Sequence, residues 1–324
     1  MKLCYVVHRY PPFPGGSEYY VQWMAEETLA RGHQVTVFTG EHQGSLNGVT
    51  VTSDPSIFQN PFDVIVVHGG DVGVQNAVLS AIPRLPSPVM YLIIKPSHSE
   101  VCRTALHHAA FVGCSTEEDW AHVRQYGVES RAVPVRHGIN PQKRRGLRGL
   151  FREKYQIPAD TRMFLSCGGY WPNKRMRELA TLFEQAELPN AILVTTGYDH
   201  HRTELIPHRT SSVLPLFLAE ETDVANAIAD ADVYLMHSSE EGFGLVLLEC
   251  MLNKTPWIAR HLAGARLMKE YGTTYTTDEE LRRILQSYHD NPGQIEAAYD
   301  HVKTTHLIQH TVDDILSAVT SRNI

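Results

Sequence analysis

The sequence has few cysteines, and they are not arranged as in a cross-linked or metal-bound fold. Its 324 residues contain five cysteines, an odd number, scattered between positions 4 and 250 without any C-x-x-C pair. This pattern excludes a disulfide framework and a zinc knuckle. We therefore expect reduced thiols and a cytoplasmic location.

Long apolar runs and an excess of positive charge are also missing. The first apolar run, "LCYVV", is too short for a signal peptide or a membrane span, so we expect the mature chain to begin at Met1. No later run reaches about 18 apolar residues, so any membrane contact would be peripheral. The net charge of −7 disfavours wholesale binding to nucleic acid or anionic membranes.

The 18 histidines do not form a metal-binding pattern. Adjacent pairs occur at His107-His108 and His200-His201, but neither pair has a third ligand at a suitable spacing. We therefore predict no metal site.

Short apolar runs typical of strands alternate with helical patterns along the chain. The series begins with "LCYVV", "EYYVQWMAEETLARG" and "QVTVFTG", and it restarts at "MFLSCGG" after a basic segment. Such alternation is typical of parallel strands with crossover helices. We predict two α/β domains, residues 1–140 and 141–324. The last helical segment, from Thr277 to Ile324, is expected to cover the second domain, with a return to the first as an open alternative.

Three loops between strand and helix are candidate ligand sites, because open α/β sheets bind ligands beyond the carboxyl ends of their strands. In the first loop, Gly15 and Gly16 precede an amphipathic helix whose N–H groups can face an anion. A tight turn without a ligand is the alternative. The loop lacks G-x-G-x-x-G, which disfavours a dinucleotide site.

The second loop, "SCGGYWPNKRMRELATL", places Lys174, Arg175 and Arg177 at the start of a helix. Cations there oppose the positive end of the helix dipole unless an anion lies between them. The loop is thus either an anion site or an ordinary solvated basic helix start.

The third loop, within "HSSEEGFGLVLLECMLNKTPW", places Glu241, Gly242, Phe243 and Gly244 before an apolar helix that carries Glu249. Free N–H groups at this terminus can bind phosphate. On a helix, eight residues separate the two acids by about 12 Å. We interpret the loop as holding phosphate between acids that bind sugar hydroxyls. In the alternative, the first acid favours the helix dipole and the second reaches solvent.

Together these segments resemble the retaining glycosyltransferases of family 4, a set of glycogen-synthase-like group 1 enzymes. The resemblance covers most of the chain and implies the GT-B fold, in which two Rossmann-like domains with parallel sheets face a central cleft. It is carried by "PPFPGGSEYYVQWMAEETLARGHQVTVFTG", "GCSTEEDWAHVRQYGVESRAVPVRHGIN", "GGYWPNKRM" and "ADADVYLMHSSEEGFGLVLLECMLNKTPWIARHLAGA". A glutamate pair with seven residues between its members is the family hallmark, and Glu241 and Glu249 match it.

The resemblance implies roles for individual residues. Glu241 would contact hydroxyls of the donor sugar, Glu249 would hold the ribose diol, and Lys174 would neutralise the diphosphate leaving group. Gly16 would approach the same diphosphate from the opposite domain. Our predicted catalytic set is Lys174, Glu241, Arg175 and His98, and our predicted donor-binding set is Gly15, Gly16, Gly169, Gly242, Phe243, Gly244, Leu245 and Glu249.

The sequence departs from the family at two positions. The family usually has an arginine where this chain has Gly169, and Arg175 or Arg177 is the candidate replacement. Many members also have a histidine at the end of the strand that corresponds to "VMYLII". Here His98 and His68 are the candidates, although a lone histidine is more often structural than catalytic.

The implied reaction moves a sugar from a UDP-, GDP- or other nucleotide-diphosphate sugar to an acceptor hydroxyl, with α linkage and without a metal or other cofactor. Two alternatives stay open: a different enzyme on the same fold, such as an epimerase or phosphorylase, and a sugar-nucleotide-binding protein without turnover. The acceptor is unresolved among glycan, lipid-linked and nucleic-acid hydroxyls. No obligate protein partner is evident.

The basic segment "KRRGLRGLFREK", residues 143–154, has six cations and one acid. We favour its interpretation as a solvated connection to the second domain. A peripheral contact with a phosphorylated lipid or with nucleic acid is the alternative.

Overall fold

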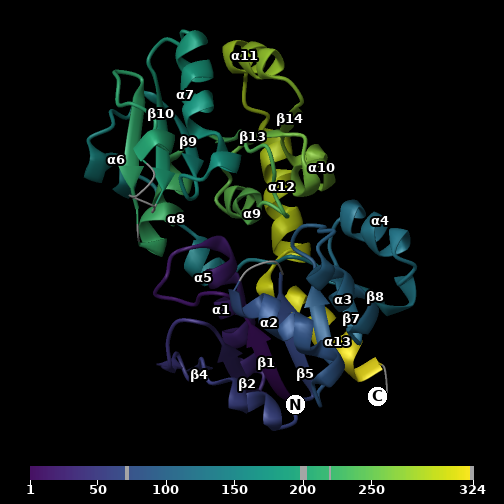
Figure 1. Cartoon of the computed structure of the whole chain (residues 1–324). Coiled ribbons are helices and arrows are strands. Elements are labelled where there is room, and N and C mark those ends of the chain that lie inside the picture. The colour runs from purple at the N-terminus through teal and green to yellow at the C-terminus, as the bar shows by residue number, and fades with distance from the viewer. Residues whose placement is uncertain (70–72, 198–202, 219, 322–324) are drawn as a thin grey trace. The chain divides into compact units, whose positions relative to one another are not determined.

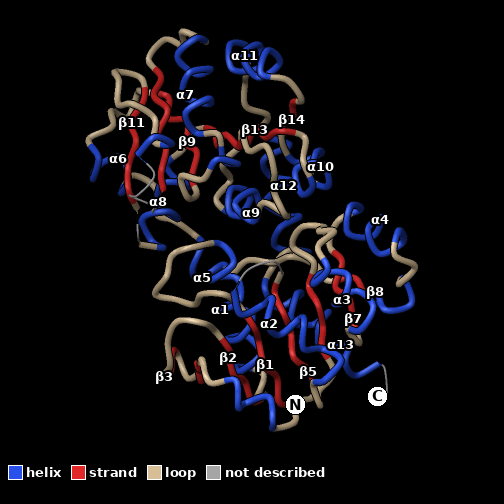
Figure 2. Tube along the Cα trace, in the orientation of Figure 1, coloured by secondary structure: helices blue, strands red, loops and turns tan. Residues whose placement is uncertain are grey.

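The computed structural model describes residues 1–69, 73–197, 203–218 and 220–321 (Figure 1). Its internal contacts divide the chain into unit 1, Met1–Ile139 with His306–Ile324, and unit 2, Asn140–Thr305. Each unit has one sheet, and Figure 2 shows its strands in red with helices in blue around them. The prediction of two α/β domains with largely parallel sheets is therefore confirmed.

Unit 1 contains an eight-stranded sheet in the order β3-β4-β2-β1-β5-β6-β7-β8. Its strands are β1 (Lys2–Val6), β2 (Gln34–Phe38), β3 (Gly44–Leu46), β4 (Val49–Thr52), β5 (Val64–His68), β6 (Val89–Leu92), β7 (Phe111–Cys114) and β8 (Ala132–Pro134). Its helices are α1 (Gly16–Ala30), α2 (Gly73–Ala81), α3 (Glu100–His108), α4 (Glu117–Gln125) and α13 (Ile308–Ser321). All strand pairs are parallel except β3 with β4, which form an antiparallel hairpin.

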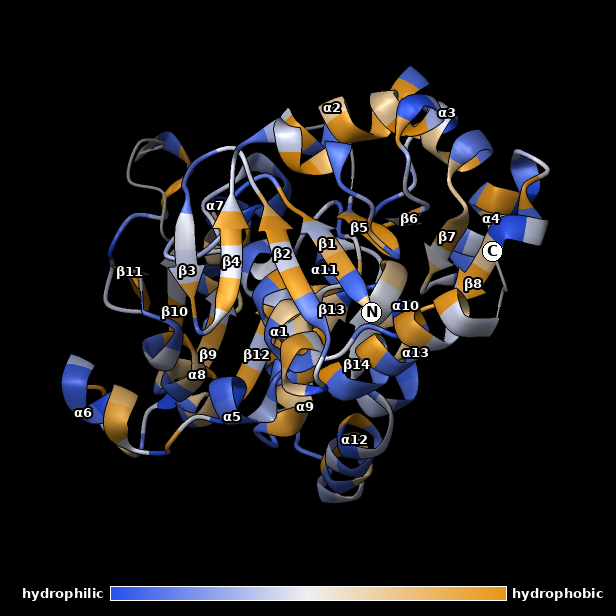
Figure 3. Cartoon of the chain, turned by 90° about the horizontal axis from the view of Figure 1, so that it is seen from below, coloured by the Kyte–Doolittle hydropathy of each residue, from blue (hydrophilic) through white to orange (hydrophobic). Residues whose placement is uncertain are grey.

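Helix α1 differs from its predicted form. An amphipathic helix was expected, but α1 buries Tyr20, Val21, Trp23 and Met24, which lie on more than one stripe of the helix. It contacts β2 and β4 of the sheet as well as α13. Since two layers cover it, its apolar surface is wider than that of a helix with one face in solvent. The neighbouring strands β1, β2 and β4 are likewise largely orange in Figure 3.

Unit 2 contains a six-stranded parallel sheet in the order β11-β10-β9-β12-β13-β14. Its strands are β9 (Arg162–Cys167), β10 (Ala191–Gly197), β11 (Val213–Phe217), β12 (Val233–Met236), β13 (Trp257–Arg260) and β14 (Thr273–Tyr275). Its helices are α5 (Pro141–Arg144), α6 (Leu150–Tyr155), α7 (Met176–Gln185), α8 (Glu221–Asp230), α9 (Leu245–Leu252), α10 (Ala263–Leu267), α11 (Asp278–Ser287) and α12 (Pro292–Thr305). Helix α12 packs on α9, whereas α13 belongs to unit 1 and packs on α1.

The order of the strands reverses at one place in the unit 2 sheet. Strand β9 pairs with β10 on one side and with β12 on the other, where Phe164 lies opposite Val233. Loops that leave the carboxyl ends of β9 and β12 therefore start side by side and diverge. Such a switch point is where open α/β sheets bind ligands.

Most of the basic segment is exposed, as expected for a solvated connection, but some of its cations pair with acids of unit 2. Its Arg152 pairs with Asp232 at 2.8 Å, and its Lys154 pairs with Asp223 at 2.6 Å. A Cβ atom on Gly146 would lie 2.1 Å from the carbonyl oxygen of Ala225, so the backbone of the segment is packed tightly on α8. Acidic residues of unit 2 therefore neutralise part of the positive charge of the segment.

Unit 1 buries two histidines, His68 and His137, whose rings are tilted against the ring of Tyr20. The ring centroid of Tyr20 lies 5.1 Å from that of His68 and 5.2 Å from that of His137. The Tyr20 hydroxyl lies 3.0 Å from Nδ1 of His137, and Nδ1 of His306 lies 2.7 Å from the carbonyl oxygen of His137. Burial lowers the pKa of both His68 and His137 to about 3. The core of unit 1 therefore holds these two imidazoles uncharged.

We expect unit 1 to lose stability as the pH falls below about 6.5, the ordinary histidine pKa. Between that pH and about 3, the unfolded chain binds protons that the folded unit excludes. The free energy of unfolding then falls by about 1.4 kcal/mol per pH unit for each histidine. Urea unfolding at pH 7.5 and pH 5.0 measures this slope. His68→Asn should roughly halve it, whereas His107→Asn, at an exposed position of α3, should leave it unchanged. If the free energy of unfolding fell equally with pH in the wild type, His68→Asn and His107→Asn, the loss of stability would not come from the buried histidines.

Candidate functional site

Lys174 and Glu241 meet at the carboxyl edge of the unit 2 sheet. Lys174 ends a short 3-10 turn after β9, and Glu241 lies in the loop after β12. The Lys174 Nζ lies 2.5 Å from Oε1 of Glu241, to which the Ser238 hydroxyl also donates a hydrogen bond of 2.6 Å. The two side chains are 24% and 12% exposed, so the pair is open to a ligand but only partly hydrated. We call these residues the Lys174–Glu241 pair.

Backbone hydrogen bonds hold the two loops together. The Ser239 N–H donates to the carbonyl oxygen of Asn173 at 2.8 Å, and the Asn173 amide donates to the carbonyl oxygen of Glu240 at 3.2 Å. These bonds fix the Lys174–Glu241 pair across the β9–β12 switch point. Sequence reasoning missed Ser238 and Asn173, although both stand within the loops that it singled out.

The loop after β12 leads into the amino end of α9. Gly244 is the N-cap residue and has a left-handed backbone with φ of 82°, a conformation that favours glycine. The first N–H groups of α9 therefore point out of the helix beside the loop that carries Glu241. The predicted helical spacing of the two acids was wrong, because α9 begins at Leu245 and Glu241 precedes the helix.

The neighbouring helix α10 fixes the backbone of Phe243. A Cβ atom on Gly264 would lie 1.8 Å from the carbonyl oxygen of Phe243, so only a glycine allows this approach. The Phe243 side chain is itself buried. Burial of the Phe243 side chain and the close packing of its carbonyl oxygen on Gly264 thus both hold the turn that precedes α9.

Glu249 lies inside α9 and is buried. Its Oε1 lies 3.3 Å from Nε of Arg144, which also lies 3.3 Å from Oε1 of Glu221. Sequence reasoning grouped Arg144 with the surface cations of the basic segment. Nothing local in the sequence marks it as buried, because its partners are 77 and 105 positions away (221 − 144 and 249 − 144).

The candidate replacements for the family arginine have other partners. Arg175 pairs with Asp278 at 3.4 Å and with Glu178 at 3.8 Å, and Arg177 contacts Nε2 of His208 at 2.8 Å. Asp278 also binds Arg260 at 2.5 Å. In this conformation Asp278 neutralises Arg175, whose side chain joins that cluster rather than the Lys174–Glu241 pair.

The family arginine is replaced by Gly169, and a neighbouring side chain occupies the space beside this glycine. A Cβ atom on Gly169 would lie 2.1 Å from Nε1 of Trp171. The Trp171 indole therefore takes the space through which a side chain at position 169 would leave the backbone. Glycine at this position is explained by the tryptophan two residues later.

The glycine loop of unit 1 contains its own anion. Helix α1 begins at Gly16, and a Cβ atom on Gly15 would lie 2.2 Å from Oε2 of Glu18. Glu18 pairs with Arg9 at 3.2 Å, and burial raises the pKa of the Glu18 carboxyl. The end of α1 where we predicted a bound anion thus carries the Glu18 carboxylate.

The two candidate histidines differ in burial. The Nδ1 of His98 lies 2.9 Å from the Tyr126 hydroxyl, and its ring lies against His122 of α4. His68 is 3% exposed and belongs to the core described above. Of the two, His98 is the one that a ligand can reach without opening the core.

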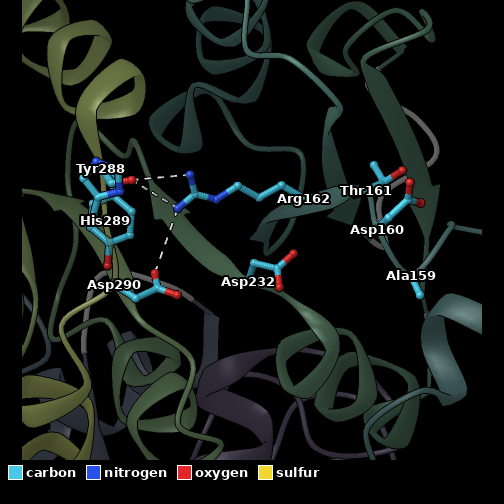
Figure 4. Close-up of a pocket in the computed structure, with 8 residues that line it drawn as sticks. All are labelled: Ala159, Asp160, Thr161, Arg162, Asp232, Tyr288, His289 and Asp290. Carbon is cyan, nitrogen blue, oxygen red and sulfur yellow. Dashed lines mark hydrogen bonds and ion pairs between the residues drawn. The ribbon is translucent and has the colours of Figure 1, made fainter.

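An open polar pocket lies at the other edge of the unit 2 sheet (Figure 4). It is lined by Ala159, Asp160, Thr161, Arg162, Asp232, Tyr288, His289 and Asp290. Arg162 is the first residue of β9 and Asp232 directly precedes β12, so the pocket lies at the amino ends of these strands. It is separate from the Lys174–Glu241 pair, which lies at the carboxyl ends.

Among the described residues, no three or more histidine, cysteine, aspartate or glutamate side chains gather closely enough to hold a metal ion. The pair His200-His201 lies outside the described residues. No helix in the described ranges has both the length and the apolarity needed to cross a membrane.

Comparison with known proteins gives consistent matches. Residues 148–275 match the family model "Glycosyl transferases group 1". N-acetyl-alpha-D-glucosaminyl L-malate synthase from Bacillus anthracis is 21% identical, and the match covers 95% of each chain. Sucrose-phosphate synthase from Thermosynechococcus elongatus has a similar structure, with a TM-score of 0.81, 16% identity and coverage of 99% of this chain and 98% of that one. HepE from Anabaena, in complex with UDP-glucose, has a TM-score of 0.78, 16% identity and coverage of 99% and 100%.

These matches agree with the geometry of unit 2. The family model spans the strands and loops that build the Lys174–Glu241 pair and the amino end of α9. The structural neighbours cover nearly the whole chain and therefore include both sheets. Residues 148–275 thus match the group 1 glycosyltransferases, and the chain as a whole has the GT-B fold of the solved neighbours.

Proposed function

We propose that the protein transfers a sugar from a nucleotide-diphosphate sugar to an acceptor hydroxyl with retention of configuration, which gives an α-linked product. One observation carries this proposal: the Lys174–Glu241 pair lies at the β9–β12 switch point, in the loop that leads into α9. The pair combines a cation for phosphate with a carboxylate for sugar hydroxyls. The helix terminus adds N–H groups suited to a phosphate.

Each group has a role in this proposal. Lys174 leaves Glu241 and binds the diphosphate, which frees the Glu241 carboxylate to accept hydrogen bonds from the donor sugar. The first N–H groups after Gly244 bind phosphate oxygens, and Glu249 accepts from the ribose diol. The resting ion pair keeps both partly buried groups compensated until the donor arrives.

The chemical step needs no protein nucleophile. The bond from the anomeric carbon to the diphosphate oxygen breaks, and its electron pair goes to the diphosphate. The acceptor oxygen bonds to the anomeric carbon on the same face, and its proton passes to the leaving diphosphate oxygen. Lys174 and the amino end of α9 stabilise the charge that grows on this oxygen, so they act on the transition state.

We expect one nucleoside diphosphate to raise the melting temperature by several degrees. A ligand at about 100 times its Kd adds about 2.7 kcal/mol to the free energy of unfolding. The panel is UDP, GDP, ADP and dTDP with their sugars, and UDP-glucose comes first because HepE is described in complex with it. Glu249→Ala should reduce the shift, whereas Glu296→Ala, at an exposed acid of α12, should not. No shift with any nucleotide would contradict the donor site.

A product assay separates transfer from its alternatives. The anomeric coupling constant of the product, measured by NMR, is expected to show an α linkage. Binding without turnover is the second candidate, because Trp171 fills the place of the family arginine at Gly169. Donor binding with no product would favour that candidate, an epimerised donor would favour an epimerase, and a β-linked product would exclude retention.

A further inference from the structure

Arg144 is buried between two carboxylates. It ends the four-residue helix α5, and its side chain is 5% exposed, compared with 8% for Glu249 and 16% for Glu221. Its Nε lies 3.3 Å from one oxygen of each acid. A buried carboxylate is strongly unfavourable without a compensating charge, so this guanidinium is what allows Glu249 to lie inside unit 2.

A second contact fixes Arg144 from its backbone. The Asn253 amide donates to the carbonyl oxygens of Arg144 and Glu249, both at 2.8 Å. The Asn253 Oδ1 accepts from the N–H of Gly146 at 2.8 Å. Asn253, the residue that follows α9, therefore holds the backbone of Arg144, while the guanidinium itself contacts Glu249.

The charges around Glu249 favour a ligand that donates hydrogen bonds. Arg144 contacts this carboxylate with its Nε 3.3 Å from Oε1. One guanidinium faces two carboxylates, which leaves one excess negative charge for hydroxyl donors. A carboxylate held in an ion pair is also restricted in rotation, so less conformational freedom is lost when it binds a ligand.

We propose that Arg144 is a positioning residue for the donor: it holds the Glu249 carboxylate in place to accept hydrogen bonds from the ribose diol. This inference rests on the proposed function, in which Glu249 binds the ribose. Arg144 acts through Glu249 and does not touch the substrate. It also ties the segment that follows Ile139 to the helix that carries Glu249.

If Arg144 only stabilised the fold, its replacement would lower the melting temperature without changing the donor KM. Asn226 provides the matched control for such a structural role. Asn226 holds the same segment through a hydrogen bond of 2.8 Å from the Leu147 N–H, a bond that involves neither Arg144 nor Glu249. Asn226→Ala is therefore expected to lower the melting temperature and leave the donor KM unchanged. Arg144→Met should lower the melting temperature and also raise the donor KM about tenfold, with kcat changed less than about twofold.

A double-mutant cycle tests whether Arg144 acts through Glu249. Glu249→Gln alone should raise the donor KM, and adding Arg144→Met should raise it further by less than about twofold. Arg144→Lys, which keeps the charge, should restore part of the affinity. Arg144→Met is also made with Glu221→Gln, because removing one cation and one anion preserves the buried net charge and favours folding.

The outcomes are distinct. The positioning role would be overturned if the donor KM stayed unchanged in both proteins that carry Arg144→Met. It would also be overturned if the increase in donor KM of the Arg144→Met, Glu249→Gln double variant equalled the product of the increases in the two single variants. If the wild-type protein binds no nucleoside diphosphate, the proposed function itself fails. If the wild type transfers sugar and Glu249→Gln raises the donor KM but the Arg144 variants do not, only the present inference fails.

Discussion

Replacing Lys174 with alanine is expected to lower kcat about 100- to 1,000-fold, the range found when a preorganised charge-stabilising group is removed. In the resting protein Lys174 lies 2.5 Å from Glu241 beside the amino end of α9. The diphosphate gains negative charge as it leaves, so the loss of a cation raises the energy of the transition state more than that of the bound donor. Steady-state kinetics at saturating donor measure the effect.

The matched control is Lys254→Ala. Lys254 follows α9, is 41% exposed and pairs with Glu296 at 2.6 Å on the surface. An exposed ion pair contributes little to stability, so kcat and the melting temperature should both stay near those of the wild type. Equal kcat values for Lys174→Ala and the wild type would show that another group stabilises the leaving diphosphate.

Gly264→Ala is expected to destabilise unit 2 by about 3 kcal/mol, the upper part of the range for overpacking. The added Cβ atom would lie 1.8 Å from the carbonyl oxygen of Phe243, which is a backbone atom and cannot rotate away. Either α10 or the turn before Gly244 must move. Because that turn leads into α9, nucleotide binding should weaken together with the loss of stability. Thermal unfolding with and without UDP measures both changes.

Gly293→Ala provides the comparison. Gly293 stands in the first turn of α12, and a Cβ atom there would come no closer than 3.5 Å to Asn291. Alanine has a higher helix propensity than glycine, so this variant should be unchanged or up to about 1 kcal/mol more stable. A similar loss of stability in both glycine variants would contradict the explanation based on close approach.

Glu241 and Glu249, the two glutamates of the family pattern, lie in different environments. Glu241 lies in a loop, is partly exposed and is paired with Lys174, which can be displaced by a phosphate. Glu249 lies within α9, is buried and is paired with Arg144. One acid is thus arranged to exchange partners and the other to stay fixed. This difference fits a sugar that reacts and a ribose that only binds.

The local sequence was sufficient to predict the fold class and the loops of the candidate site. Alternation of apolar runs with helical patterns predicted two largely parallel sheets, because strands buried on both faces must be apolar throughout. Glycines at a strand-to-helix turn predicted the amino end of α9, since few other residues adopt the backbone of Gly244. These properties depend on neighbours in the chain and can be read from it.

Contacts between distant residues decided the rest. The sequence placed Arg144 in a solvated basic stretch, but its charge is buried between Glu221 and Glu249. It offered Arg175 as a replacement for the arginine missing at Gly169, but Arg175 pairs with Asp278 and Trp171 fills the space beside Gly169. Composition and spacing show which residue types are present. The partner that each charged side chain finds, and the water that it loses, are set only when strands and helices far apart in the chain pack together.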